Sequence, residues 1–406
     1  MDINKSLVLA HQLLVSGKID EAESKLNEII KLDSKNIFAL NNLGNLNLGR
    51  RNFDKALLFF NKCLKFKPDF YQALINKGTC LQYLDKNLEA LDCYEEALKL
   101  NPDFVDTYYN LANCFLKLKK YENAIKNYNK VVKNNPSYFK AFYNKGICLE
   151  ELENYKEALE NYNIVIKTKY DFSQAHLHKG NCLQKLKLFE DALLCYKEAI
   201  KIKSDYSVAY NNLGCLQLLM GNYDEGWKNY EWRKKEFLKL DADKKWDGIK
   251  NLKNKTIYIY KEQGIGDYIQ FSRYLPIIKK LGANIILDTT KKLVPLINSM
   301  KFDYIHKDME NINDKEFDYH CSIVSLPLLF KTSIDSIPNK APYFSIDKEK
   351  INLWSKKINP NKKNIGIKWT GNKNFWNDKN RSTNLDQIKS LFNLPFEFHS
   401  LEIERS

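Results

Sequence analysis

Small and aromatic residues recur along the first 240 residues at a spacing of 34 positions. In each repeat a small residue is followed 12 positions later by a second one, and four positions further on by an aromatic residue. The first small residue is Gly44, Gly78, Ala112, Gly146, Gly180 or Gly214, and the aromatic residue is Phe60, Tyr94, Tyr128, Tyr162, Tyr196 or Tyr230. Two helices can cross closely only where their side chains are small, and an aromatic ring fills the space beside the crossing. The pattern therefore predicts pairs of packed helices.

This pattern resembles the tetratricopeptide repeat, which implies an α-solenoid. Proline ends three of the repeats, because it lacks an N–H and clashes with the preceding helical turn. Counting in both directions predicts seven units with the boundaries 3–36, 37–70, 71–104, 105–138, 139–172, 173–206 and 207–240. The first unit is degenerate, with Ala10 and Ala22 at its small positions, so we expect it to cap the solenoid.

The cysteines follow the same spacing. One repeat position holds Cys80, Cys114, Cys148 and Cys182, and leucine holds it in flanking units. A cysteine that interchanges with leucine is expected to be a small buried hydrophobe. The absence of a C-x-x-C pair argues against zinc, and we expect no metal site. Nine cysteines, an odd number, favour free thiols in a reducing, cytoplasmic compartment.

One polar column is prominent in the repeats. The sixth position of five of the seven units is asparagine: Asn42, Asn76, Asn110, Asn144 and Asn212. This column is similar to the asparagine ladder of the O-GlcNAc transferases. A carboxamide both donates and accepts hydrogen bonds, so such a ladder could hold a peptide backbone in the solenoid groove. The alternative is an ordinary solvated helix face in an asparagine-rich protein.

The net charge of +14 does not by itself indicate nucleic-acid binding. Only six of the 64 basic residues are arginine, and the excess is divided between residues 1–250 and 251–406. A nucleic-acid-binding protein more often concentrates its basic residues on one stripe, so we expect no nucleic-acid partner. No run of about 18 apolar residues predicts a transmembrane segment.

The periodicity changes after residue 250. Strands are predicted at 256–260, 284–287 and 317–324, and helices at 268–281 and 291–300. The order strand, loop, helix, strand implies a parallel sheet in an α/β domain. A glycine-containing turn, Glu262-Gln263-Gly264-Ile265-Gly266-Asp267, joins the first strand to the first helix. Ligands bind at such turns in α/β folds.

The string from Glu262 to Phe271 resembles the heptosyltransferase-like domain of family-9 glycosyltransferases that is fused to tetratricopeptide repeats in bacteria. Further motifs that carry this resemblance are Trp246-Asp247-Gly248, His320-Cys321, Ser325-Leu326-Pro327, Trp369-Thr370-Gly371-Asn372 and Arg381-Ser382. The resemblance implies two Rossmann-like halves of the GT-B type and an inverting, metal-independent glycosyl transfer. We therefore expect a linker at 241–253, a first Rossmann-like domain at 254–346, a connecting helix at 347–363 and the start of a second domain at 364–406.

The resemblance also implies site residues. Asp267 occupies the place of the catalytic aspartate and would take a proton from the acceptor hydroxyl, although an aspartate there also stabilises a helix N-terminus. The cleft would be formed by Gln263, Gly264, Gly266, His320, Ser325, Gly371, Asn372, Lys373 and Arg381. Arginine suits a nucleotide diphosphate, whereas a lysine- and asparagine-rich surface loop is the alternative around residues 371–381.

The second domain is the point at which the resemblance weakens. About 45 residues of it are present, whereas a full half needs about 150, so the donor site is expected to be incomplete and the chain to be a fragment or a truncated form. Two functions remain. One is transfer of a sugar from a nucleotide-sugar donor, with no other cofactor, to a protein or saccharide chosen by the repeats. The other is a non-catalytic scaffold for protein–protein interaction.

Overall fold

The structure is a computed structural model that describes residues 2–233, 240–262, 264–339, 343–368, 382–383 and 385–400. It divides into two compact units, Met1–Lys235 and Glu236–Ser406. Most contacts of each unit are internal to it. In the part of the chain so described, none of the helices combines the length and the hydrophobicity needed to cross a membrane.

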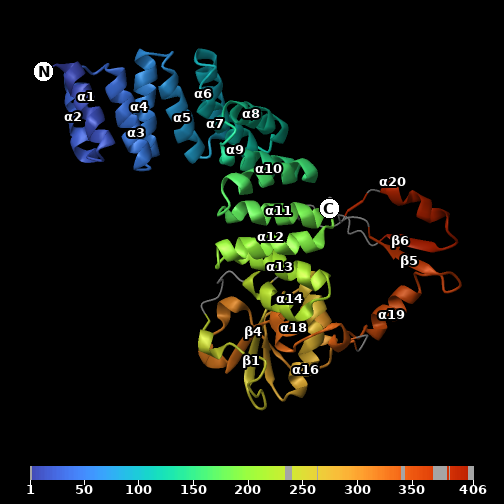
Figure 1. Ribbon diagram of the computed structural model, residues 1–406. Coiled ribbons are helices and arrows are strands. Elements are labelled where there is room, and N and C mark those ends of the chain that lie inside the picture. The colour runs from blue at the N-terminus through green and yellow to red at the C-terminus, as the bar shows by residue number, and fades with distance from the viewer. Residues whose placement is uncertain are drawn as a thin grey trace. The chain divides into compact units, whose positions relative to one another are not determined.

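The first unit is built from helix pairs, and fourteen α-helices occupy residues 3–230 of the described chain (Figure 1). The first helices of the pairs are α1 (Ile3–Val15), α3 (Ile37–Gly49), α5 (Tyr71–Tyr83), α7 (Val105–Lys117), α9 (Phe139–Glu151), α11 (Ser173–Lys185) and α13 (Ser207–Leu219). The second helices are α2 (Ile19–Leu32), α4 (Phe53–Phe66), α6 (Asn87–Leu100), α8 (Tyr121–Asn134), α10 (Tyr155–Thr168), α12 (Phe189–Ile202) and α14 (Tyr223–Tyr230). Each first helix begins at the first residue of a unit in the 34-residue scheme.

The small and aromatic positions meet at the helix crossings, as the pattern predicts. A Cβ atom added to Gly78, Gly146 or Gly180 would lie within 2.8 Å of the tyrosine ring of the same pair. In the last pair, Gly214 faces backbone instead, and an added Cβ would be 2.5 Å from the amide nitrogen of Tyr230. Glycine is therefore required there by the close approach of α13 and α14.

The turn inside each pair repeats a left-handed backbone conformation. Its φ angle is positive at Gly17, Arg51, Asp85, Lys119, Glu153, Lys187 and Gly221, again 34 residues apart. Glycine adopts this conformation without strain, but the five residues with side chains do not. The turn ends one helix and starts the next, because an α-helix cannot continue through a left-handed residue.

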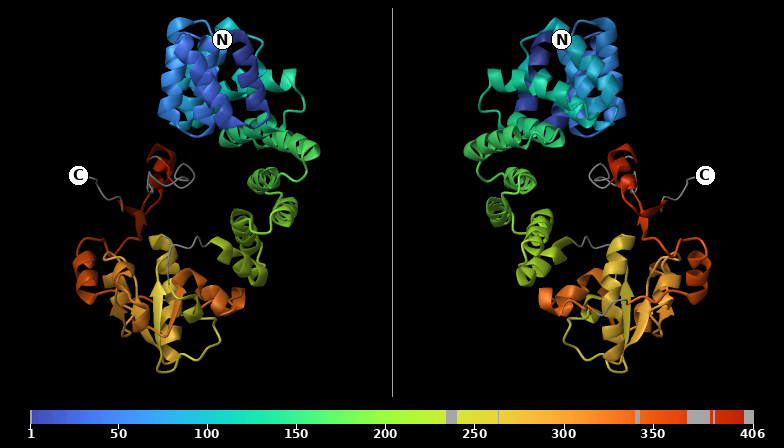
Figure 2. Two further views of the ribbon diagram at one scale, coloured as in Figure 1. Left: turned by 90° about the vertical axis from the view of Figure 1, so that its left-hand side faces the viewer. Right: turned by 90° about the vertical axis from the view of Figure 1, so that its right-hand side faces the viewer.

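Neighbouring pairs stack mainly through the second helix of one pair and the first helix of the next, and the successive first helices also touch. Helices α3, α5, α7, α9 and α11 contact one another in succession, which places them on the inner side of the curved array. Both views of Figure 2 show the helices of this unit following one another from blue to green.

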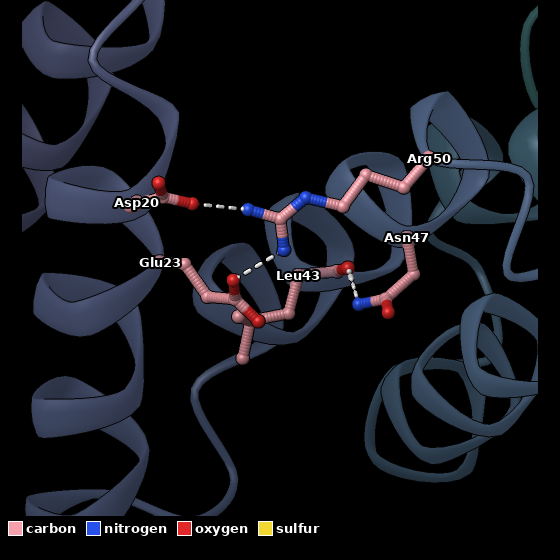
Figure 3. Close-up of polar contacts among 5 residues, drawn as sticks. All are labelled: Asp20, Glu23, Leu43, Asn47 and Arg50. Carbon is pink, nitrogen blue, oxygen red and sulfur yellow. Dashed lines mark hydrogen bonds and ion pairs between the residues drawn. The ribbon is translucent and has the colours of Figure 1, made fainter.

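A polar contact joins the first two pairs: the Arg50 guanidinium at the end of α3 forms ion pairs with Asp20 and Glu23 of α2 (Figure 3). Beside it, the buried Asn47 side chain donates to the Leu43 carbonyl at 2.7 Å.

The cysteines of the repeat column lie in the core, which confirms their assignment as buried hydrophobes. Cys80, Cys114, Cys148 and Cys182 have no exposed surface. Burial raises the pKa of each thiol, to about 11 for Cys80 and to about 12 for Cys114 and Cys148. Such thiols are protonated at neutral pH and therefore unreactive.

The second unit contains a parallel sheet of four strands within its described residues. The strands are β1 (Thr256–Tyr260), β2 (Asn284–Leu287), β3 (Ile305–His306) and β4 (Tyr319–Ser322), in the order β3-β2-β1-β4. Every neighbouring pair is parallel. Residues 257–260 of β1 are buried, as expected for a central strand covered on both faces. On one face, Tyr258 and Tyr260 pack against Phe317 and Met309.

The helices between these strands are shorter than the sequence predicts. In place of one helix at 268–281, the chain forms α15 (Ile265–Phe271), a turn of 3-10 helix and then α16 (Leu275–Lys280). Pro276 lies in the first turn of α16, where its missing N–H needs no partner, so it begins a new helix instead of continuing α15. The helix predicted at 291–300 is reduced to α17 (Val294–Asn298).

The segment predicted as a linker, 241–253, packs onto the sheet. Lys245 forms a bridge with His320 of β4, and Trp246 is 2% exposed with its ring against Phe330. Gly248 has a φ of +82°, and an added Cβ would be 2.5 Å from the Leu329 carbonyl oxygen. The compact unit therefore includes residues on the N-terminal side of residue 254, because the tryptophan is buried against it.

The C-terminal part has a second, smaller sheet. Strands β5 (Asn364–Ile367) and β6 (Glu397–Ser400) pair in parallel, and α19 (Lys348–Ser355) and α20 (Leu385–Ile388) are the α-helices of its described residues. A Rossmann-like second half is an expectation from the resemblance, and these two strands are the β structure described after residue 364.

Candidate functional site

The candidate site lies on the first helices of the solenoid. Its polar side chains are held in place by a column of buried tyrosines on the second helices. Tyr94, Tyr128, Tyr162 and Tyr196 of the second helices have no exposed surface. Each hydroxyl donates to a polar side chain on the first helix of its own pair. The acceptors are Gln82 at 2.9 Å, Asn113 at 2.6 Å, Glu150 at 3.0 Å, and Asn181 and Gln184 at 3.0 and 2.8 Å. The buried hydroxyl thus fixes polar groups on the inner helices.

The predicted asparagine column is partly buried and connects successive pairs. Asn144 donates to Asn113 of the preceding pair at 2.9 Å, and Asn212 donates to Asn181 at 2.9 Å. Asn76 donates to Asn41 at 3.1 Å. At the corresponding position of the sixth pair, His178 lies 2.9 Å from a Glu150 carboxylate oxygen. These contacts give Asn76, Asn144 and Asn212 a structural role that the sequence did not suggest, and they use only the amide nitrogen of these three side chains.

A hollow of about 590 Å³ opens beside this column on helices α5, α7 and α9. Its lining is dominated by carboxamide and hydroxyl groups, with one acid and one base. The lining residues are Thr79, Gln82, Tyr83, Asp85, Asn87, Asn110, Asn113, Leu116, Lys117 and Asn144. Two of the five column asparagines, Asn110 and Asn144, therefore border the hollow, whereas the other three lie elsewhere along the column.

Asn110 is the column residue best placed to meet a ligand. It is half-buried, and its main-chain carbonyl accepts from the Gln82 side chain at 3.3 Å. Its own carboxamide forms no hydrogen bond with a described residue. In contrast, Asn144 already donates to Asn113. The hollow can therefore offer both preorganised and unoccupied amide groups, which suits a ligand with alternating donors and acceptors.

The sequence did not identify the residues that organise this hollow. Thr79, Gln82 and Asn113 lie at the ninth and twelfth positions of their units, where residue types vary from unit to unit. A signal was present in the tyrosine column, because a buried tyrosine hydroxyl needs a polar partner. Each tyrosine therefore implies a polar residue on the helix that it crosses.

In the second unit, Asp267 lies where the sequence places it, in the first turn of a helix. It is the third residue of α15 and is half-buried, and its Oδ2 would lie 3.5 Å from a Cβ added to Gly264. Gly264 is the N-cap residue, and Gly266 is exposed with open space where a Cβ would be. In the strand order, β2 and β3 lie on one side of β1 and β4 lies on the other. The turn after β1 therefore lies at the point where the order of the strands switches direction, which is where ligands bind in such sheets.

Two other predicted cleft residues are buried instead of lining an open surface. His320 is 5% exposed, and its Nε2 lies 2.9 Å from the Asp241 carbonyl oxygen, with its ring near Tyr260 and Phe317. Ser325 is 2% exposed. The segment 241–253, predicted as a linker, instead covers His320, because Lys245 pairs with it and the Asp241 carbonyl oxygen lies beside its ring. Gln263, Gly371, Asn372, Lys373 and Arg381 lie outside the described residues.

A buried ion pair near the strand ends was missed. Asp288 follows β2 with a fully buried side chain, and its Oδ1 accepts from the Lys261 ammonium, after β1, at 3.0 Å. Burial raises the pKa of Asp288, while Lys261 acts in the opposite direction. Adjacent parallel strands end at one edge of a sheet, so polar residues after each could have been expected to meet.

Among the described residues, no three His, Cys, Asp or Glu side chains are grouped to hold a metal ion.

The geometry defines a class of protein, a solenoid of helix pairs with a small residue and an aromatic residue at each crossing. Family models described as tetratricopeptide repeat match residues 105–138 and 173–206, 127–160 and 195–228, and 39–70. A further model, described as TPR repeat, matches residues 84–119. Residues 3–230 are therefore a tetratricopeptide-repeat solenoid, and the predicted repeat class is confirmed. None of the proteins with curated descriptions matches the sequence significantly.

Solved structures similar to this chain include YrrB, described as a TPR protein with an unusual peptide-binding site. It is 23% identical, with a TM-score of 0.42, and the match covers 45% of this chain and 95% of that one. A tetratricopeptide repeat protein from Parabacteroides merdae is 16% identical, with a TM-score of 0.46 and coverage of 59% and 94%. Pseudomonas aeruginosa PilF is 17% identical, with a TM-score of 0.47 and coverage of 52% and 96%.

Proposed function

We propose that this chain is a protein-interaction scaffold that holds an extended peptide segment of a partner protein against the inner helices of its solenoid. The hollow on α5, α7 and α9 carries this proposal. It combines a volume of about 590 Å³ with a lining of carboxamides, and tyrosine and inter-repeat hydrogen bonds hold several of these in place.

Peptide backbone is the chemistry that this lining fits best. Each peptide unit has one N–H and one C=O, and a carboxamide can satisfy either. The lining contains a single acid, Asp85, and a single base, Lys117, so it has little net charge. Strong selection for a phosphate or for a highly charged side chain is therefore not expected. Preorganised side chains lose less conformational entropy on binding, which favours affinity.

A peptide selected from a random phage-displayed library on the full chain provides the probe. Its Kd should rise by about tenfold for Asn110→Ala, because the substitution removes an amide that the folded protein does not itself use. The matched control is Asn134→Ala with Asn163→Ala, two exposed asparagines on α8 and α10 away from the hollow. Equal affinity of the Asn110 variant and this control would overturn the proposal.

Glycosyl transfer from a nucleotide sugar, by a GT-B type enzyme with Rossmann-like halves, is the second candidate function. The observation that favours it is the parallel order β3-β2-β1-β4, with Asp267 in the turn that follows β1. Ligands of open α/β sheets bind where such an order reverses. In this proposal Asp267 is the general base toward an acceptor hydroxyl, Gly264 and Gly266 leave room for the donor, and the solenoid presents the acceptor protein or saccharide.

Calorimetry with UDP, ADP and GDP on the full chain tests this second candidate. Micromolar binding of one nucleotide is expected if a donor pocket is present. Asp267→Asn should then retain nucleotide binding and lose transfer to acceptor, since it removes the base but keeps the shape. Binding of none of the three nucleotides would remove the candidate, and it would leave the peptide-binding proposal untouched because that site lies in the other unit.

A further inference from the structure

A second hollow, of about 540 Å³, lies in the α/β unit far along the chain from the solenoid site. It is bordered by α16, by the residues after α17 and by the chain segment 343–345. Helices α16 and α17 each lead into a strand of the parallel sheet, so their C-terminal ends lie at the amino edge of the sheet. Asp267 and its glycines follow a strand and lie at the opposite edge. The hollow is therefore separate from the proposed transferase cleft.

The lining combines apolar side chains with positive charge. Pro276, Ile277, Met300 and Phe344 form its apolar part. Three basic residues, Arg273, Lys280 and Lys301, border it, and no aspartate or glutamate does among the described lining residues. None of the three forms an ion pair with a described residue, although such pairs are common elsewhere in this chain. The positive charge at the hollow is thus not neutralised by described protein groups.

The segment 343–345 is fastened across the hollow by specific contacts. The Ser345 hydroxyl and amide both donate to the Ser299 carbonyl oxygen, and the Tyr343 hydroxyl donates to the Ile269 carbonyl at 3.3 Å. The Arg273 guanidinium lies 5.2 Å from the centre of the Tyr343 ring, and its Nε donates to the Gln270 carbonyl at 2.8 Å. Arg273 is therefore held in place with its terminal nitrogens available.

Helix capping accounts for only part of this charge. A cation in the last turn of a helix interacts favourably with the helix C-terminus, and Lys280 ends α16. Arg273 precedes α16, so the same explanation does not apply to it. Lys301 lies beyond α17 in a left-handed backbone conformation with a φ of 58°, a place that favours glycine or asparagine over lysine.

We infer that this hollow binds a small organic anion with an apolar body, such as an aromatic or aliphatic carboxylate, sulfonate or phosphate ester. The guanidinium of Arg273 can hold two oxygens of the acidic group at once, and the ammonium groups of Lys280 and Lys301 add charge-assisted hydrogen bonds. The apolar body lies against Ile277, Met300 and Phe344. This site is independent of peptide binding and of glycosyl transfer.

The anionic dye 8-anilinonaphthalene-1-sulfonate is the probe, and N-phenyl-1-naphthylamine, which has the same rings without the sulfonate, is its neutral counterpart. Fluorescence titration of the full chain should show tighter binding of the sulfonate. Arg273→Gln with Lys301→Gln should weaken sulfonate binding by about tenfold and leave the neutral dye unaffected, because only the charge-assisted bonds are lost. Phe344→Ala should weaken both dyes.

The matched control is Lys291→Gln with Lys292→Gln, which removes two exposed charges after β2 at the opposite edge of the sheet. Thermal unfolding of each variant checks that the α/β unit remains folded, since partly unfolded protein also binds these dyes. Equal losses of sulfonate affinity in the control and in the Arg273 variant would overturn the inference, as would equal affinity of the wild-type chain for both dyes.

Discussion

Gly146 of α9 lies directly against the ring of Tyr162 of α10, so that a Cβ atom on Gly146 would be 2.6 Å from Cε1 of the tyrosine. The hydroxyl of the same tyrosine reaches Glu150, one helical turn further along α9. The pair thus sets both the helix spacing and the position of a polar group on the inner face. Packing and binding surface are coupled through a single side chain.

This contact predicts a strong penalty for a larger residue at the crossing. Gly146→Val should destabilise the solenoid by about 2–3 kcal/mol, since the ring must move and overpacked cores cannot relax fully. Urea denaturation followed by circular dichroism measures the loss. Gly49→Val is the control, because nothing lies within 4 Å of its added Cβ. Adding Tyr162→Ala should make the combined loss smaller than the sum of the two single losses, and strict additivity would contradict the crossing argument.

The left-handed turns predict a stabilising substitution. Lys187 has a φ of 61°, a conformation that costs a residue with a side chain roughly 1 kcal/mol. Lys187→Gly should therefore raise the free energy of unfolding by about 0.5 kcal/mol, after the greater flexibility of glycine in the unfolded chain is subtracted. Lys197→Gly, on the exposed face of α12, should instead lower it by about 1 kcal/mol. Destabilisation by both variants would exclude strain at the turn.

Stability should fall in mild acid because of His176. This side chain is 5% exposed, and burial lowers its pKa below the ordinary value of 6.5, although its bond to the Tyr170 carbonyl acts in the opposite direction. The folded state therefore favours the neutral ring. The resulting stability is present above about pH 6.5 and is lost as the pH falls through the lowered pKa, since the unfolded chain takes up the proton first.

Thermal unfolding between about pH 7 and pH 5 measures this effect. His176→Gln cannot be protonated, so its midpoint should fall less over this range than that of the wild type. His11→Gln changes an exposed histidine on α1 and serves as the control for the loss of a histidine. A wild-type pH dependence retained in His176→Gln would show that another group is responsible.

Thiol reactivity should distinguish one cysteine from the other eight. Cys215 is exposed, whereas the remaining cysteines are buried. Packing around its sulfur still raises the pKa of Cys215, so its reaction with Ellman's reagent should be slower than that of a free thiol. One thiol is expected to react in the native chain and none in Cys215→Ser. Rapid reaction of several thiols in the native chain would contradict the burial of the cysteine column. The denatured chain, in which all nine thiols should react, is the reference.

Repeat class, helix pairing and the burial of the cysteine column follow from the sequence alone. The reason is that each unit packs only on its neighbours, so the same local contact recurs and leaves a mark every 34 residues. The contact between Gly146 and Tyr162 can be predicted from the sequence because the spacing of the two residues is fixed within one helix pair. Strands β1 and β2 of the α/β unit are also predictable from their apolar runs, whereas the two-residue strand β3 (Ile305–His306) is too short to leave such a run and was not predicted.

The binding surfaces were decided by tertiary structure. The hollow beside Asn110 needs groups from three helix pairs, and the basic hollow brings Arg273 together with Lys301 and Phe344, which no local spacing connects. Burial of His320 under residues 241–246 likewise depends on a contact between segments about 80 residues apart, as in the 2.9 Å approach of its Nε2 to the Asp241 carbonyl. Local periodicity records contacts within a repeating unit, whereas a site assembled from distant segments exists only after the chain has folded.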